Sequence, residues 1–306
     1  ERTIESKKPV TEEIELTSGQ RDTGQVVLSV NAEPLPGFVG DKYFRVILRD
    51  DTHRVETEQV RRDFVANASH ELRTPLSIIN GYIENLREGA VEDSKLAHRF
   101  LGIMKKHGDR IARIVEDMLT ISKFESAAHD PTKAGAFDLQ SCAHDVVERL
   151  HPLIEEKQAN ITVTPENSPS LICGDRFYWD QIFFNLVENA LKQNVRTGLN
   201  VKISFHDQDT HFRICISDDG VGIPMADLPF IFKRFYRVEK HHSKEIKGTG
   251  LGLSIVKRAI ESHGGTVEAS STPGKETAFV IHVPKGDVEH AVLMETESEE
   301  QLFEAR

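Results

Sequence analysis

The chain has 306 residues, of which 38% are hydrophobic and 28% are charged, proportions typical of soluble globular proteins. A chain of this length is long enough for about two domains. Its formal net charge of −11 argues against nucleic acid or an acidic membrane surface as a general partner.

Three widely separated cysteines, Cys142, Cys173 and Cys215, include no CxxC pair. Such a sparse, odd-numbered set fits a reducing compartment and argues against a disulfide scaffold or a zinc site. The sequence has no signal peptide and no apolar run of roughly 18 residues. Because it opens in polar residues without an initiator Met, we expect a fragment of a longer protein, with any membrane anchor upstream.

Residues 1–54 have the pattern of short β-strands. The sequence predicts strands over 24–30 and 43–48, separated by a turn at Pro34-Leu35-Pro36-Gly37. These strands are too few for an independent domain. We therefore interpret them as the last strands of a larger sensory fold.

From Val60 the apolar residues recur at helical spacing. One predicted stripe comprises Val60, Phe64, Ala68, Leu72, Leu76, Ile79, Ile83 and Leu86, and a second comprises Phe100, Met104, His107, Ile111, Val115 and Met118. Gly89 and the polar residues after it separate the stripes, which predicts an antiparallel helical hairpin. Because a lone hairpin cannot bury both stripes, we expect two chains to form a dimeric four-helix bundle.

The stretch 127–135 contains Pro131 and has the composition of a linker. Beyond it, helices are predicted over 141–157, 176–194 and 250–263, and strands over 161–164, 200–206, 211–217, 266–271 and 277–283. This mixture predicts an α/β domain. The acidic stretch 287–306 is predicted to be a loose tail.

His70 lies on the outer side of the first predicted helix. Steps of about 100° per residue place it about 160° from Leu72, with Thr74 one turn along on the same side. Glu71 can hydrogen-bond one ring nitrogen and keep the other unprotonated and nucleophilic. Pro75 removes the backbone donor to the Glu71 carbonyl and loosens the helix beside the histidine. Surface decoration is the ordinary alternative for a helical histidine, and these neighbours argue against it.

The segment Ser69-His70-Glu71-Leu72-Arg73-Thr74-Pro75-Leu76 resembles the phosphoacceptor box of sensor histidine kinases. The resemblance implies that His70 is the phosphoacceptor and that Glu71 is its acid/base partner. It also implies that Thr74 positions water when the family's phosphatase activity removes phosphate from a partner's aspartate.

Asn185, Asn189 and Lys192 share one face of the predicted helix over 176–194. Amide oxygens suit Mg²⁺, which keeps several waters and needs few protein ligands. Lys192 can offset phosphate charge. The alternative for these residues taken alone is a solvated helix face.

The segment Asp218-Asp219-Gly220-Val221-Gly222-Ile223 follows a predicted strand. An aspartate here can accept a hydrogen bond from the exocyclic amine of a purine, while Gly220 and Gly222 let the ring approach the backbone. The alternative is a calcium-binding or turn-forming acidic loop. No regular ladder of further oxygen ligands supports calcium.

A second glycine-rich segment, Gly248-Thr249-Gly250-Leu251-Gly252, precedes an apolar helix and can present backbone N–H groups to an anion. Its spacing fits neither the Rossmann nor the P-loop pattern. Aromatic residues over 230–236 and the polar run 238–247 precede it, and they could form a lid. Arg234 and Arg237 could then reach phosphate oxygens.

In order and spacing, these four pieces resemble the N, G1, F and G2 boxes of the histidine-kinase ATP-binding domain. The resemblance covers about residues 60–284. It implies a two-layer α/β sandwich that binds ATP, with Mg²⁺ on Asn189, adenine on Asp218 and phosphates on Gly248–Gly252. Two departures stand out: Gln193-Asn194 follows Lys192 where an aromatic residue is common, and Lys247 replaces a common glycine.

We therefore predict an α+β protein. Its expected parts are a sensory remnant at 1–54, the phosphotransfer hairpin at 55–127, the ATP-binding domain at 128–286 and the tail at 287–306. The end of the remnant, Arg49-Asp50-Asp51-Thr52, looks like the end of a PAS domain. The resemblance implies autophosphorylation of His70 and a homodimer whose partner is a response regulator receiver domain. It also implies a cytoplasmic location, with a membrane anchor only upstream.

Two alternatives stay open. The first is an ATPase of the wider superfamily, of the chaperone or topoisomerase type, which needs no acceptor histidine. The second is a degenerate kinase that serves as a dimeric scaffold, and Gln193 and Lys247 are its only support.

Overall fold

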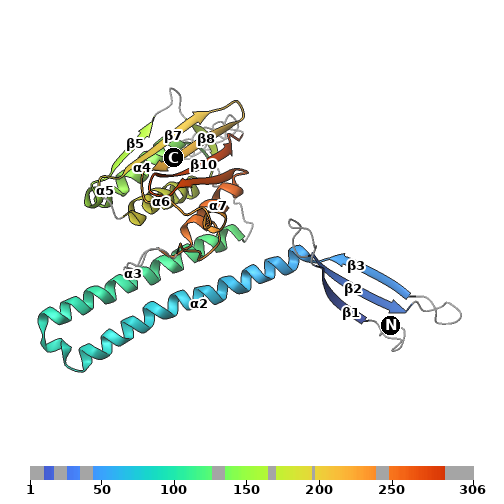
Figure 1. Cartoon of the computed structure of the whole chain (residues 1–306), viewed down its shortest axis with the longest axis horizontal. Helices are drawn as coiled ribbons and strands as arrows, with labels where there is room; N and C mark the ends of the chain where they lie inside the picture. Colours follow the sequence, from blue (N-terminus) through green and yellow to red (C-terminus); the bar gives the residue numbers. More distant parts are fainter. Residues whose placement is uncertain are drawn as a thin grey trace, which may run out of the picture. The chain divides into compact units, whose positions relative to one another are not determined.

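The computed structural model (Figure 1) describes residues 10–16, 26–34, 44–125, 135–164, 170–194, 197–238 and 248–286. The chain divides into two compact units, Glu1–His70 and Glu71–Arg306. The tail 287–306, most of the predicted linker and most of the polar run 238–247, with Lys247, lie outside the described residues. Over the described ranges, no helix combines the length and apolarity needed to cross a membrane.

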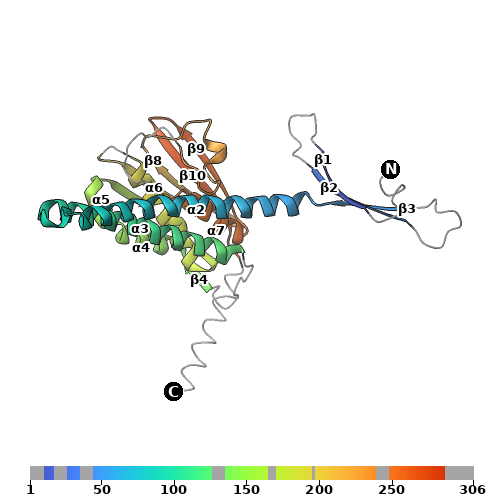
Figure 2. The same cartoon turned by 90° about the horizontal axis from the view of Figure 1, so that it is seen from below.

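The first unit begins with an antiparallel sheet in the order β1-β2-β3, seen nearly edge-on in Figure 2. Its strands are β1 (Val10–Leu16), β2 (Val26–Pro34) and β3 (Phe44–Asp50). The two predicted strands are present, and β1 was not predicted. Its sequence VTEEIEL carries three glutamates, and six of its seven residues are exposed. Its pairing with β2, rather than an apolar pattern, therefore defines it.

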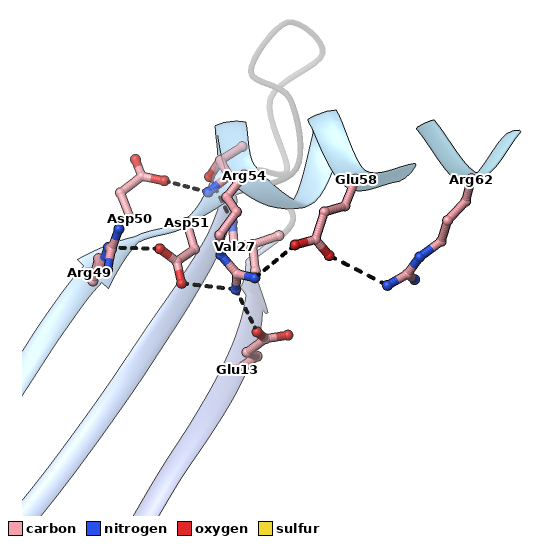
Figure 3. Close-up of polar contacts among 9 residues, drawn as sticks. Glu13, Val27, Arg49, Asp50, Asp51, Arg54, Glu58 and Arg62 are labelled. Atoms are coloured by element: carbon pink, nitrogen blue, oxygen red, sulfur yellow. Dashed lines mark hydrogen bonds and ion pairs between the residues drawn. The ribbon is translucent and has the colours of Figure 1, made fainter. Parts of the chain in front are cut away.

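The junction between this sheet and helix α2 (Thr52–Arg87) is held by Arg54. Its guanidinium donates to the carboxylates of Asp51 at 3.1 Å, Glu13 at 3.0 Å and Glu58 at 3.3 Å, as Figure 3 shows. Asp51 is buried. The backbone N–H of Val27 donates to the Thr52 hydroxyl at 3.0 Å, and these contacts together join the sheet to the first turn of α2.

Helix α2, the 3-10 turn η1 (Ala90–Glu92) and helix α3 (Ser94–Glu125) form the predicted hairpin. The carboxylate of Asp93 caps α3 by accepting from the N–H groups of Lys95 and Leu96. Tyr82 and Phe100 pack across the hairpin with ring centroids 4.8 Å apart. Figure 1 shows α3 running back along the second part of α2.

The apolar stripe predicted for α3 was partly wrong. Val115 is 42% exposed, while Ile114, Ile121 and Phe124 are buried. These three lie on the part of α3 that packs against the α/β domain; Phe124 stacks on Tyr178 with ring centroids 4.4 Å apart. A long-range contact, which periodicity cannot reveal, therefore selects the buried face. Elsewhere on the hairpin, Leu76, Ile83 and Leu101 stay exposed in the single chain.

The α/β domain has a five-stranded mixed sheet in the order β5-β7-β8-β10-β9. The strands are β5 (Asn160–Thr164), β7 (Asn200–Asp207), β8 (His211–Asp218), β9 (Thr266–Thr272) and β10 (Glu276–Pro284). Strands β5 and β7 pair in parallel, and the other pairs are antiparallel. Helices α4 (Leu139–Arg149), α6 (Arg176–Gln193) and α7 (Gly252–Ser262) cover one face (Figures 1 and 2). Fully buried side chains such as Trp179, Phe183, Ile203 and Ile255 fill the interface between the layers. The predicted two-layer sandwich is confirmed.

Three local predictions differ from the structure. The helix predicted over 141–157 is two helices, α4 and α5 (His151–Lys157), which meet at Leu150 because Pro152 begins a new helix. Two four-residue strands, β4 (Gly135–Asp138) and β6 (Leu171–Gly174), were not predicted, and Gly135 had been assigned to the linker. Each of these strands is too short to show a period, and their pairing with each other defines them.

Candidate functional site

A cavity of about 740 Å³ lies among α6, α3 and both glycine-rich segments. This volume is typical of small-molecule sites. Nine of the predicted binding residues line it: Asn185, Asn189, Asp218, Gly222, Arg237, Gly248, Thr249, Gly250 and Gly252. The structure thus brings together residues that span 68 positions of sequence, from 185 to 252.

Four predicted binding residues do not line this cavity: Lys192, Gly220, Arg234 and Leu251. The ammonium of Lys192 donates to the carboxylate of Glu188 at 2.6 Å, on the same helix. Leu251 is fully buried at the start of α7. Gly220 is buried and Arg234 is half-buried. The predicted direct contacts of these four residues with a ligand are therefore not supported by the lining of this cavity.

Asp218 supplies a half-buried acceptor at the cavity end of β8. Its Oδ1 accepts from the backbone N–H of Gly220 at 3.0 Å and from the amide of Asn194 at 3.4 Å. Burial raises the pKa of Asp218, and these two hydrogen bonds partly oppose the rise. A carboxylate held in this way suits recognition of a single N–H donor on a ligand.

The cavity face of α6 carries amide and carboxylate oxygens. The amide nitrogen of Asn185 donates to the Gln181 carbonyl, and its Oδ1 lies so near Gly252 that a Cβ there would come within 2.5 Å. Asn189 lines the cavity one turn further on. Glu188, which the sequence analysis did not single out, also lines it and accepts from Arg113 at 3.2 Å. The position of Glu188 between Asn185 and Asn189 on the same helix could have indicated from the sequence that it lies near the site.

The second glycine-rich segment depends on close backbone packing. Gly250 has φ of 75°, and a Cβ there would lie 2.8 Å from the Cα of Phe235. The N–H of Phe235 donates to the Gly250 carbonyl at 2.8 Å. Glycine is therefore required at this position, because both the left-handed backbone and the contact exclude a side chain.

Helix α3 contributes one wall of the cavity, a contact that was not predicted from the sequence. The hydroxyl of Thr249 donates to the carboxylate of Asp117 at 2.7 Å. Burial raises the pKa of Asp117, and the hydrogen bond from Thr249 opposes the rise. Local sequence could not reveal this contact, because 132 residues separate its partners.

The three residues predicted from the phosphoacceptor box lie on α2, where His70 and Thr74 are exposed and Glu71 is half-buried. The carboxylate of Glu71 accepts a hydrogen bond of 2.6 Å from the guanidinium of Arg110 on α3. Arg110 was not predicted. It fixes the position and neutralises the charge of the carboxylate next to the histidine in sequence.

Two segments of the chain, one in the hairpin and one in the α/β domain, match known protein families. Residues 60–127 match the family model of the His Kinase A (phospho-acceptor) domain. Residues 174–287 match that of histidine kinase-, DNA gyrase B- and HSP90-like ATPases.

Two relatives share most of this chain. It is 34% identical over 268 residues to the sensor histidine kinase WalK of Bacillus subtilis, covering 87% of this chain and 43% of the relative. It is 36% identical over 245 residues to the sensor protein kinase WalK of Staphylococcus aureus, covering 78% and 57%. The chain thus spans about half the length of these curated relatives.

Two solved structures share the fold. The histidine kinase AdeS of Acinetobacter baumannii matches with a TM-score of 0.56 and 24% identity, covering 71% of this chain and 98% of that chain. The histidine kinase ThkA, solved in complex with the response regulator protein TrrA, matches with a TM-score of 0.59 and 23% identity, covering 93% and 81%. At this identity the likeness shows the fold alone.

Proposed function

Because this chain belongs to the sensor histidine kinases, we propose that it transfers the terminal phosphate of ATP to His70 and then to an aspartate of a response regulator receiver domain. One observation carries the proposal. An exposed histidine in a matched phosphoacceptor segment is followed, in the same chain, by a matched ATPase domain whose glycine-lined cavity contains Asp218.

The residues that line the cavity fit ATP. Asp218 would accept from the exocyclic amine of adenine, and the backbone of Gly222 would line the site beside the ring. Gly248, Thr249, Gly250 and Gly252 would receive the phosphates at the start of α7, where anions bind favourably. Arg237 would add positive charge.

A magnesium ion fits the same face of α6. Asn189 would hold it, with Asn185 beside it, since both present amides at the cavity. Mg²⁺ retains several waters and needs few protein ligands. When bound with ATP, the ion would offset charge on the phosphates.

In the transfer step, an unprotonated ring nitrogen of His70 attacks the γ-phosphorus. The P–N bond forms as the bond to the bridging oxygen breaks, and ADP leaves. Positioning and charge neutralisation supply most of the catalysis in such reactions. Glu71 would act as acid/base partner of the ring, and its ion pair with Arg110 holds it at this level of the hairpin.

We also keep four finer predictions as part of this proposal. The hairpin pairs with a second copy, which would cover the exposed Leu76, Ile83 and Leu101. Thr74 positions water for removal of phosphate from the receiver. The domain boundaries are at 54/55, 127/128 and 286/287; the matched segments 60–127 and 174–287 support the second and, within one residue, the third. The strands before Asp51 are the end of a PAS-like domain.

Labelling with γ-³²P-ATP tests the proposed function. We expect acid-labile, base-stable label on the chain, lost in His70→Gln and retained in His98→Gln, which changes another exposed histidine of the hairpin. ATP hydrolysis without any label would favour the superfamily ATPase instead. Neither label nor nucleotide binding would favour the scaffold.

A further inference from the structure

Asn194, at the end of α6, makes three hydrogen bonds from a buried amide. Its nitrogen donates to the Ala190 carbonyl at 2.7 Å and to Oδ1 of Asp218 at 3.4 Å. Its oxygen accepts from the backbone N–H of Val221 at 2.6 Å. The side chain is 3% exposed. In the sequence, Asn194 was noted only as part of Gln193-Asn194, which follows Lys192 where the family commonly has an aromatic residue.

We propose that Asn194 is a positioning residue for nucleotide selection: it holds Asp218 and the turn after it in the arrangement that recognises the exocyclic amine of adenine. The inference rests on the proposed function, since it names how the same site selects its nucleotide.

The pattern of hydrogen bonds at Asp218 supports this role. Within the described residues, the hydrogen bonds from Asn194 and from the Gly220 N–H both end on Oδ1. They hold Oδ1 in place and leave Oδ2 as the acceptor for a ligand. A half-buried acceptor that a bound ligand closes off from water discriminates strongly, because a ligand without the matching donor leaves it unpaired.

Gly220 shows how closely Asn194 fits the turn. A Cβ on residue 220 would lie 2.0 Å from the Asn194 Oδ1. Gly220 was predicted to let the purine ring approach the backbone, yet it does not line the cavity. Its missing side chain makes room for the asparagine, so Asn194 and Gly220 act as one unit behind Asp218.

The same turn contains a matched pair that does not face the cavity. Asn200 on β7 donates from its amide to the carboxylate of Asp219 at 2.7 Å. Both residues are exposed, and neither lines the cavity. Asn200→Ala therefore removes an asparagine–aspartate hydrogen bond from the same turn without touching Asp218.

The experiment measures the dissociation constants of ATP and of inosine triphosphate, which carries a carbonyl oxygen in place of the amine. The full chain is compared with Asn194→Ala, Asn200→Ala, Asp218→Asn and the Asn194→Ala/Asp218→Asn double variant. We expect the full chain to prefer ATP by roughly a hundredfold or more. Asn194→Ala should reduce this preference by about tenfold, mainly by weakening ATP binding. Asn200→Ala should keep it.

A purely structural role as a helix cap makes a different prediction. Asn194→Ala would then weaken the binding of ATP and of inosine triphosphate equally. The ratio of their dissociation constants would stay that of the unmodified chain. That result overturns the inference. So does a further reduction of the ratio by Asn194→Ala in the Asp218→Asn background, because a residue that acts through Asp218 has nothing left to change there.

Two further controls keep the outcomes distinct. If Asn194→Ala does not fold, Asn194→Leu keeps the size of the side chain and removes the donor to Asp218 without adding a charge beside it, and the same reduced ratio is expected. If the unmodified chain binds neither nucleotide, the proposed function itself fails and the inference falls with it. Binding of ATP with an unchanged ratio in both variants refutes the inference alone.

Discussion

Thr249 in the second glycine-rich segment donates a 2.7 Å hydrogen bond to Asp117 on the second helix of the hairpin. The contact places a carboxylate of the hairpin at the segment proposed to receive the phosphates of ATP. Asp117 also lines the cavity. A negative charge there opposes a triphosphate, and the hydroxyl it engages is withdrawn from the ligand.

We therefore predict that Asp117→Asn increases ATP affinity. The amide keeps an acceptor for Thr249 but removes the charge, so the repulsion of the phosphates is relieved; we expect roughly a fivefold to tenfold lower Kd. Asp109→Asn is the control, because Asp109 is an exposed carboxylate on the same helix, paired with Lys105. Isothermal calorimetry checks the result, and equal or weaker binding by Asp117→Asn would contradict it.

Replacing Asp218 should have opposite effects on the thermal stability of the chain and on its affinity for ATP. Burial raises its pKa in the folded chain above the ordinary 3.8. Its stabilising contribution is therefore complete below the unfolded pKa and is lost as pH rises through the folded pKa. At pH 7 the buried charge is a penalty, and we expect Asp218→Asn to raise Tm by about 2–4 °C while weakening ATP binding.

The pH dependence provides the check on this prediction. The difference in Tm between Asp218→Asn and the unmodified chain should shrink as pH falls through the folded pKa toward 3.8, since both side chains are then neutral. Thermal melts without nucleotide at several pH values measure it. A lower Tm for the variant at pH 7 would mean that the hydrogen bonds to the carboxylate outweigh its desolvation.

Two glycines with nearly the same positive φ, Gly250 and Gly274, distinguish the cost of a strained backbone from the cost of a steric contact. Gly250 has φ of 75° and Gly274 has φ of 74°, but a Cβ at Gly250 would meet Phe235 at 2.8 Å while one at Gly274 meets nothing within 4 Å. Gly274→Ala should destabilise the domain by about 1–2 kcal/mol and leave ATP affinity unchanged. Gly250→Ala should cost more and lower ATP affinity at least tenfold. Chemical denaturation and nucleotide titration of both variants decide whether the contact matters.

Variants of the two partners of the Glu71–Arg110 ion pair should show whether Glu71 acts in the chemical step or only in the structure of the hairpin. If Glu71 is the acid/base partner of His70, Glu71→Gln should slow autophosphorylation by about a hundredfold. Arg110→Met, which breaks the same pair from the other helix, should slow it less while destabilising the hairpin comparably. Initial rates of His70 labelling and thermal melts distinguish them, and equal losses of rate would assign Glu71 a structural role.

At the start of α2, Arg54 should control how firmly the helix is joined to the sheet. Arg54→Ala removes its contacts with Glu13, Asp51 and Glu58 and should speed hydrogen exchange at the Val27 and Asp51 amides, which bond across this junction. Arg62→Ala is the matched control, since Arg62 contacts Glu58 alone among these carboxylates. Exchange followed by NMR or mass spectrometry tests it, and equal protection in both variants would rule the role out.

The sequence by itself predicted the elements and segments whose pattern is contained in one continuous stretch of the chain. The helical period from Val60 predicted the hairpin, the strands after residue 200 were predicted within a few residues, and the spacing of polar and glycine segments predicted nine residues that meet in one cavity. The apolar periods repeat along the chain and the polar and glycine segments are each continuous in sequence, so each can be recognised without knowing its partner.

Tertiary structure decided everything that depends on a partner distant in sequence. Strands β4 and β6 exist because they pair with each other, and Ile114 rather than Val115 is buried because the α/β domain packs on that face. The contacts of Asp117 with Thr249, Glu71 with Arg110 and Asn194 with Asp218 join residues 24 to 132 positions apart. A hydrogen bond depends on distance and angle in space, and no period in the sequence encodes either.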